Sequence, residues 1–317
     1  MIDPADILII GGGPAGLSAA TSIVRQCHTA IIFDSRSYRS ESPFMHTVPT
    51  WDHRNPEDFR AAARKDLERY GTVTVENAEI VMIEKKEDGM FKVKDDDGKT
   101  WVGRKVILAT GVKDVFPNIP GYAECWISGI FHCLYCHGWE VRGLSSSGML
   151  AEGDTGSTLT ALHLARMNLR FSSKVTLYTN GNDPLASDIE AALAKSSTAP
   201  MEVEPRQIAK FEKGAKTAEV VVHFVDGTSK LEGFISHKPQ TVLKGVLHEQ
   251  LGLELTPKGV IQVNPLGGTS VKGVFAAGDI AQPFTQAVGT AISSGTAAGA
   301  GAPLQVQAET WGQQPLF

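Results

Sequence analysis

Short unbroken apolar runs separated by amphipathic segments open the chain. Residues 6–10 and 30–34 are such runs, and residues 15–25 between them have the pattern of a helix. Strands that are buried on both faces of a parallel sheet lose polar alternation, so this order predicts a β-α-β unit. Further along, the pattern predicts a helix over 56–70, meander strands over 73–75, 79–85 and 91–94, and a buried strand over 105–111.

The same order returns in the middle of the chain. A turn over 148–156 precedes a predicted helix over 158–168 and a strand over 174–178. The pattern then predicts strands over 203–210, 216–224 and 233–237, a strand within 269–279, and a helix of small residues over 288–300. Two β-α-β units in one chain indicate the α/β class.

The turn after the first apolar run is a Gly-x-Gly-x-x-Gly sequence. Its members are Gly11, Gly12, Gly13, Pro14, Ala15 and Gly16. Gly11 permits a tight turn, Gly13 lets the backbone approach a pyrophosphate, and Gly16 lets helix and strand pack closely. The free amides of the helix N-terminus then face the phosphates. Asp34 ends the second strand, where its carboxylate can accept hydrogen bonds from an adenosine ribose, so the pattern predicts dinucleotide binding.

Other residues are expected around the same dinucleotide. The loop from Ser35 to Ser40 should wrap the adenosine through Ser35, Arg36, Ser37, Tyr38 and Arg39. His46 either touches a flavin or fills a polar loop. The strand ending in Ala109, Thr110 and Gly111 lets the cofactor come close because its last residues are small.

The C-terminal part carries a second set of cofactor signals. Gly278 allows close approach and Asp279 can accept a hydrogen bond from a ribityl hydroxyl. Gln286 and Ala287 precede a helix whose N-terminus could point at the electron-rich edge of a flavin. Because these signals lie at both ends of the chain, one domain is predicted to form from both ends, with the middle inserted.

The second glycine turn is altered. With Asp154 aligned as the acid that often follows the third glycine, the first two glycine positions hold Ala151 and Glu152. A carboxylate there would face two phosphates. The following strand ends in residues 178–181 without an arginine for a 2′-phosphate. The fold is expected to persist while nicotinamide binding is lost, and an unusual loop that still binds NADPH is the alternative.

The predicted architecture is therefore α/β, with two Rossmann-like dinucleotide-binding domains. The FAD-binding domain takes residues 1–117 and 244–317 and is split around an inserted, degenerate NAD(P)-type domain at residues 118–243. Pro117 and the Pro120-Gly121 pair mark the first crossing between them.

Cys133 and Cys136 form a Cys-x-x-Cys pair in the inserted domain, while Cys27 and Cys125 are isolated. Such a pair is a redox couple, half of a metal site, or coincidence. A metal site needs further ligands at similar spacing, and none follow, so no metal is predicted. A dithiol that opens and closes needs one sulfur to attack and another to resolve, which this spacing supplies.

Composition and charge limit the classes of partner that the chain is expected to bind. The 317 residues are enough for two domains, and the net charge of -5 comes without a long Lys/Arg run, so nucleic acid is not expected. No apolar run approaches the roughly 20 residues of a membrane span, and the N-terminus enters a strand instead of a signal sequence. A cytoplasmic protein without a membrane partner is expected.

These residues together resemble the thioredoxin-reductase-like flavoproteins over essentially the whole chain. The resemblance rests on residues 11–16, Asp34, 109–111, the cysteine pair, 274–279 and 286–287. Within that group, residues 133–138, residues 51–54 and the broken second turn resemble the dithiol oxidases of microbial natural-product clusters, of the gliotoxin and holomycin oxidase type. The resemblance implies FAD, a small-molecule dithiol substrate, molecular oxygen as acceptor with peroxide as product, and a homodimer.

The resemblance also assigns roles at the cysteine pair. Cys136 should face the flavin, and Cys133 should meet the substrate. Thioredoxin reductases place an Asp after the second cysteine, where this chain has His137. Because the pKa of histidine lies near ambient pH, His137 is the candidate acid–base group, with packing in the first helical turn as the alternative. His132 is a second candidate.

Other functions remain open from sequence. The chain could be an NADPH-dependent thioredoxin or disulfide reductase, or a redox-sensing flavoprotein that signals through a partner. Residues lining a substrate pocket are expected from 44–54 and from the tail 311–317, and the substrate itself is not readable.

Overall fold

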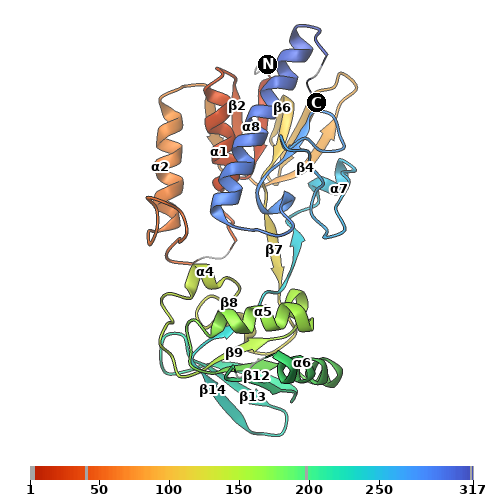
Figure 1. The fold of residues 1–317 in the computed structure, drawn as a ribbon. Helices are drawn as coiled ribbons and strands as arrows, with labels where there is room; N and C mark the ends of the chain where they lie inside the picture. Colours follow the sequence, from red (N-terminus) through yellow and green to blue (C-terminus); the bar gives the residue numbers. More distant parts are fainter. Residues whose placement is uncertain (1–3, 40–41, 197–198, 315, 317) are drawn as a thin grey trace. The chain divides into compact units, whose positions relative to one another are not determined.

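A computed structural model describes residues 4–39, 42–196, 199–314 and 316, which form two compact units (Figure 1). The first unit takes residues 1–39, 43–113 and 242–317, and the second takes 40–42 and 114–241. The crossings therefore follow Lys113 and Thr241, where the sequence placed them after residues 117 and 243. The last residues of the predicted loop 35–40 and of the tail 311–317 lie partly outside the described residues.

The first unit is built on a seven-stranded sheet of order β3-β2-β1-β6-β5-β4, with β17 also pairing with β6. Its strands are β1 (Ala5–Ile10), β2 (Ala30–Phe33), β3 (Val73–Glu76), β4 (Ile80–Lys85), β5 (Phe91–Asp95), β6 (Thr100–Leu108) and β17 (Val274–Ala276). Its helices are α1 (Pro14–Val24), α2 (Pro56–Glu68), α7 (Leu247–Gln250), η2 (Gly278–Ala281) and α8 (Val288–Thr310).

The central strands of this sheet are parallel, with Ile7 opposite both Ala30 and Lys105. One apolar cluster joins the sheet to α1 and α8. The other lies on the second face of the sheet, where Leu247 of α7, Leu253 and Ile261 join it. Helices α1 and α8 lie side by side (Figure 1) because glycines remove the side chains between them. A Cβ at Gly295 would overlap the carbonyl oxygen of Ala15, and one at Gly299 that of Ala19.

The second unit contains a parallel sheet of order β11-β10-β9-β15-β8 and an antiparallel sheet of order β12-β13-β14. The strands are β8 (Ile130–Phe131), β9 (Ser147–Leu150), β10 (Val175–Tyr178), β11 (Met201–Glu204), β12 (Ile208–Lys213), β13 (Val220–Phe224), β14 (Ser229–Glu232) and β15 (Ile235–Ser236). The helices are α3 (Tyr122–Cys125), α4 (Leu134–His137), η1 (Gly153–Thr155), α5 (Thr158–Asn168) and α6 (Asp183–Ser196).

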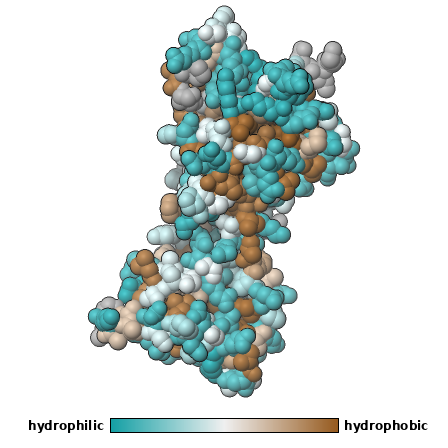
Figure 2. All heavy atoms as spheres, turned by 90° about the vertical axis from the view of Figure 1, so that its right-hand side faces the viewer, coloured by the Kyte–Doolittle hydropathy of each residue, from teal (hydrophilic) through white to brown (hydrophobic). Residues whose placement is uncertain are grey.

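The two chain crossings are strands that pair with each other, β7 (Val112–Val115) and β16 (Gln240–Leu243). The α/β class with parallel sheets is confirmed. Figure 2 shows hydrophilic and hydrophobic residues interspersed on the face that it presents. Among the described residues, no helix combines the length with the apolar character that a bilayer crossing demands.

Several predicted elements were wrong in extent. The strand predicted over 105–111 is β6, which ends at Leu108, and the strand predicted over 216–224 is β13, which begins at Val220. The strand predicted over 203–210 is two strands, β11 and β12, which belong to different sheets and flank Pro205. Proline has no amide to donate to a ladder, so the chain turns there. The helix predicted over 288–300 continues through Pro303 to Thr310, because Ala302 and Val306 remain buried in the first unit.

Candidate functional site

The first glycine turn lies between β1 and α1 and is shaped for a phosphate group. Gly11 has φ +123°, and a Cβ there would overlap the carbonyl oxygen of Ala109. Gly13 differs, because a Cβ on it would meet no protein atom within 4 Å. No side chain caps α1, Pro14 stands at its start, and its first turn holds no acid. The amides of this helix are therefore available to an anion.

Asp34 follows β2 and is only 2% exposed. Its carboxylate accepts hydrogen bonds from the Arg36 amide at 2.9 Å, from the Tyr38 hydroxyl at 2.7 Å, and from the Arg64 guanidinium. Burial and the hydrogen bond to Asp34 raise the pKa of Tyr38. The ribose contact of Asp34 stays a prediction, and the protein groups that fix the carboxylate are now identified.

Arg64 was missed by the sequence analysis, as was Arg60, whose guanidinium lies 3.7 Å from the centre of the Tyr38 ring. Both belong to α2. Their spacing of four positions puts them on one helix face, and this spacing was the available signal. Ser35, Arg36 and Ser37 are exposed in the loop between them and β2.

Arg39 connects the two ends of the chain within the first unit. Its guanidinium donates to Asp279 at 3.0 Å and to the side-chain oxygen of Gln286 at 2.7 Å. Gly278, with φ +78°, lies against Ala15, since a Cβ on it would come 2.9 Å from the Ala15 side chain. Ala287 is the N-cap of α8, which again has no side-chain cap and no acid in its first turn.

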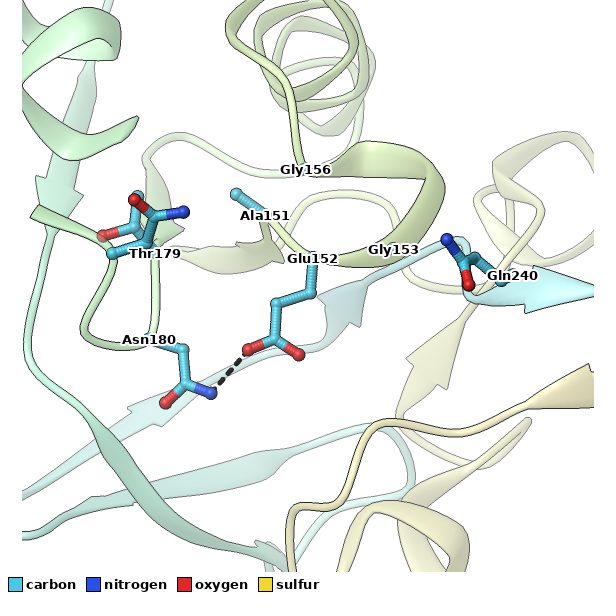
Figure 3. Close-up of a pocket in the computed structure, with 8 residues that line it drawn as sticks. Ala151, Glu152, Gly153, Gly156, Thr179, Asn180 and Gln240 are labelled. Atoms are coloured by element: carbon cyan, nitrogen blue, oxygen red, sulfur yellow. Dashed lines mark hydrogen bonds between the residues drawn. The ribbon is translucent and has the colours of Figure 1, made fainter. Parts of the chain in front are cut away.

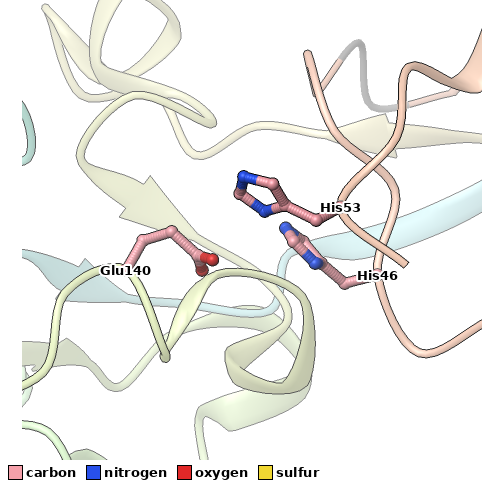
Figure 4. A group of neighbouring side chains, drawn as sticks. All are labelled: His46, His53 and Glu140. Atoms are coloured by element: carbon pink, nitrogen blue, oxygen red, sulfur yellow. The ribbon is translucent and has the colours of Figure 1, made fainter.

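His46 lies on the loop between β2 and α2. The loop is closed by a bridge between Met45 and Arg54, and the Thr47 amide donates to Asp52 at 2.8 Å. The His46 ring lies 3.5 Å from Asp52, and the neighbouring His53 ring stacks on Phe44. Figure 4 shows His46 and His53 on this loop; the Glu140 side chain drawn with them belongs to the second unit. The contact of His46 with a flavin stays a prediction.

The first unit fits a dinucleotide. Gly13 leaves open space where a pyrophosphate would lie, and the N-termini of α1 and α8 are both uncapped. The Thr110 hydroxyl, next to Ala109 at the end of β6, is buried and makes no hydrogen bond to any described residue. A buried hydroxyl without a partner is costly, so a bound group that supplies one is favoured.

Cys133 and Cys136 form a disulfide in the second unit, with their Cα atoms 5.2 Å apart. Cys133 is the N-cap of α4, and its sulfur accepts a hydrogen bond from the Cys136 amide at 3.1 Å. Both cysteines are half-buried, and Tyr135 between them is 77% exposed. The other two cysteines take no part, since Cys27 and Cys125 are free.

The two histidines beside this disulfide are held by aromatic stacking. The His137 ring stacks on Phe131, with centroids 4.8 Å apart and planes 18° apart. The His132 ring stacks on Trp126 at 5.3 Å, and the two imidazoles are 6.4 Å apart. Stacking on an aromatic neighbour fixes the plane of each imidazole ring.

The second glycine turn surrounds a pocket of about 400 Å³ in the second unit (Figure 3). The pocket lies at the carboxyl ends of β9 and β10 and is lined by Ala151, Glu152, Gly153, Gly156, Thr179, Asn180, Asn182 and Gln240. Glu152 accepts a hydrogen bond from the Asn180 side chain at 2.6 Å. The pocket is therefore present, with a carboxylate where the sequence placed it.

Comparison with known proteins agrees with this arrangement. The family model described as "Pyridine nucleotide-disulphide oxidoreductase" matches residues 5–295. The chain is 44% identical over 316 residues to "Thioredoxin reductase tcpT" of Claviceps purpurea, covering 98% of this chain and 97% of that protein. It is 42% identical to "Thioredoxin reductase aclD" of Aspergillus oryzae, covering 95% and 96%.

Among solved structures, an oxidoreductase from Agrobacterium tumefaciens superposes with a TM-score of 0.84 at 31% identity, covering 97% of this chain and 99% of that chain. Both fungal relatives are named as thioredoxin reductases. The expected likeness to that group is confirmed.

Proposed function

The chain belongs to the pyridine nucleotide-disulphide oxidoreductase family, and from this premise we propose that it is an FAD-dependent dithiol oxidase. It closes a disulfide in a small-molecule dithiol and uses molecular oxygen as the final acceptor. The observation that carries the proposal is the half-buried Cys133–Cys136 disulfide beside an exposed Tyr135, in a unit whose own nucleotide turn holds Glu152. An oxidoreductase that works on disulfides follows from the family; the oxidase direction is the proposal.

FAD would be held by the first unit. Its pyrophosphate would lie against Gly13 and the N-terminus of α1, its adenosine near Asp34 and Tyr38, and its ribityl chain near Asp279. Bound FAD would supply the two-electron chemistry between the enzyme dithiol and oxygen. The chain's own residues supply position and handle protons.

The thiol exchange uses the chain's two sulfurs in turn. A substrate thiolate attacks Cys133, the Cys133–Cys136 bond breaks, and Cys136 leaves as a thiolate. The second substrate thiol then displaces Cys133, so the substrate disulfide forms and both enzyme sulfurs are reduced. The Cys136 amide, which already donates to the Cys133 sulfur, stabilises the Cys133 thiolate as it leaves. Over a full cycle one dithiol and one O2 give one disulfide and one H2O2.

His137 is the proposed proton acceptor for the incoming thiol. It lies next to Cys136 in the chain, and its ring plane is fixed against Phe131. A base with a pKa near ambient pH raises the fraction of thiolate without becoming permanently charged. His132, stacked on Trp126, is the second candidate for this role.

An NADPH-dependent disulfide reductase is the other function to test, since the printed names of the fungal relatives favour it. The carboxylate of Glu152 in the second nucleotide turn argues against it. The two functions run electrons in opposite directions through the same cysteine pair, so one experiment separates them.

The test measures oxygen uptake by FAD-loaded protein with a panel of small dithiols, with and without NADPH. We expect uptake with a dithiol alone and equal amounts of peroxide and disulfide. Mixing with NADPH without oxygen should leave the flavin absorbance unchanged, and rapid bleaching would instead establish the reductase. Cys136→Ser should lose turnover and keep its flavin, with Cys27→Ser as the matched control that keeps both. Parental turnover by Cys136→Ser would contradict the mechanism.

A further inference from the structure

The second unit keeps the framework of a dinucleotide site. Its parallel sheet has the order β11-β10-β9-β15-β8, so the chain reverses direction across the sheet between β9 and β15. Ligands of such sheets bind outside the carboxyl ends of the strands at this switch point. The pocket of about 400 Å³ lies there, bordered by residues that follow β9 and β10.

The two nucleotide turns of this chain can be compared directly. In the first unit α1 begins at Pro14, the fourth residue after β1 ends at Ile10. In the second unit α5 begins at Thr158, the eighth residue after β9 ends at Leu150. The Ser157 side chain caps α5 by accepting from the Thr160 amide at 3.3 Å. The helix amides that α1 leaves free are thus partly used in α5.

The decisive difference is charge. The first turn contains no acid, whereas Glu152 stands two residues after the end of β9, where the first turn has Gly12 two residues after the end of β1. Figure 3 shows its side chain reaching toward Asn180, and the Asn180 amide holds it at 2.6 Å. Asn180 is itself fixed, because its oxygen accepts from the Ile208 amide at 2.6 Å.

The described residues place no neutralising cation on the Glu152 carboxylate. Among the described residues, Glu152 forms no ion pair, and the nearby Lys238 is paired with Asp154 at 3.5 Å. A dinucleotide pyrophosphate carries two negative charges, so it would meet an uncompensated like charge in a partly buried pocket. The residues of this turn therefore do not fit a pyridine dinucleotide.

The rest of the pocket remains suitable for an adenosine ribose. Thr179 and Asn180 follow β10, where a ribose is recognised in this fold, and the Thr179 hydroxyl is buried without a hydrogen-bond partner in the described chain. Residues 178–181 include no arginine, so nothing there would recognise a 2′-phosphate.

We infer that the second unit is a latent dinucleotide site closed by the single carboxylate of Glu152, and that this residue sets the nucleotide selectivity of the chain. Removing the carboxylate opens the site to NADH in preference to NADPH. The inference shares Glu152 with the argument for the proposed oxidase, but its test measures nucleotide binding, whereas the test of the oxidase measures turnover of a dithiol.

The test is calorimetric titration of FAD-saturated full-length protein with NADH and with NADPH. The parent should bind neither. Glu152→Gly should bind NADH at least tenfold more tightly than the parent and more tightly than NADPH. Glu152→Gln, which keeps a side chain that can pair with Asn180, should gain part of this affinity, because it removes charge without volume. Asp154→Asn is the matched control, since that acid does not line the pocket, and it should behave like the parent.

Three results would overturn the inference. The parent could bind NADH as tightly as Glu152→Gly, the glycine variant could show no gain while retaining the parent's thermal stability, or Asp154→Asn could gain as much as Glu152→Gly. If Glu152→Gly failed to fold, absence of any gain in the folded Glu152→Gln variant would decide against the role of charge.

Discussion

Gly13→Ala is expected to weaken cofactor binding without disturbing the fold. Gly13 has φ -80° and ψ -175°, a conformation that alanine adopts freely, and an added Cβ would meet no protein atom within 4 Å. Folding should therefore tolerate the change, with a gain of about 0.4–1 kcal/mol from the lower entropy of the unfolded chain.

Flavin binding should respond in the opposite direction. If a pyrophosphate lies against Gly13, a methyl group there pushes it away from the amides of α1. Losing one hydrogen bond to a charged group costs roughly 1.5–3 kcal/mol, and each 1.4 kcal/mol is a factor of ten in affinity. We therefore expect FAD to bind about ten- to a hundredfold more weakly.

The assay compares thermal unfolding of the flavin-free proteins with FAD titration followed by visible absorbance. Gly11→Ala is the contrasting variant, because φ +123° and the overlap with Ala109 should reduce stability itself, by about 1–3 kcal/mol from conformation alone. Parental FAD affinity in Gly13→Ala would refute the placement of the pyrophosphate. Equal loss of stability in both variants would refute the open space at Gly13.

Three further predictions concern stability and catalysis. Burial lowers the pKa of His237 to about 4. Below pH 6.5 the unfolded state therefore binds a proton that the folded state does not bind, and the free energy of unfolding should fall by about 3 kcal/mol between pH 7 and pH 4. Urea unfolding at several pH values should show this decrease in the parent and not in His237→Gln. His137→Asn should lower dithiol turnover by roughly 10²-fold and remove a pH dependence from kcat, with flavin content unchanged; an unaltered pH profile would count against it. Gly295→Ala should destabilise the first unit by about 1–3 kcal/mol in thermal unfolding through overlap with Ala15, whereas Gly289→Ala, which points into open space on the same helix, should not.

Most of the correct predictions of strands, helices and turns came from patterns of residues that are close together in the sequence. The apolar runs identified β1, β2 and β6, and the helix over 158–168 was placed at its observed ends. The glycine turn and the Cys-x-x-Cys pair were readable for the same reason, because their chemistry depends on residues a few positions apart. The carboxylate of Glu152 in the second turn was also identified from sequence, and the structure places this residue in the lining of the pocket.

Contacts between distant segments were decided only by the folded chain. Arg39 meets Asp279 across 240 positions, and Arg64 reaches Asp34 from a helix whose orientation no periodicity reports. The strand predicted over 203–210 is two strands that belong to different sheets, and only strand pairing determines this. Which segments become strands, helices and reactive turns depends on neighbours along the chain, so these could be predicted from the order of residues. Which charges and hydroxyls meet depends on how sheets and helices pack, so this became known only from the folded protein.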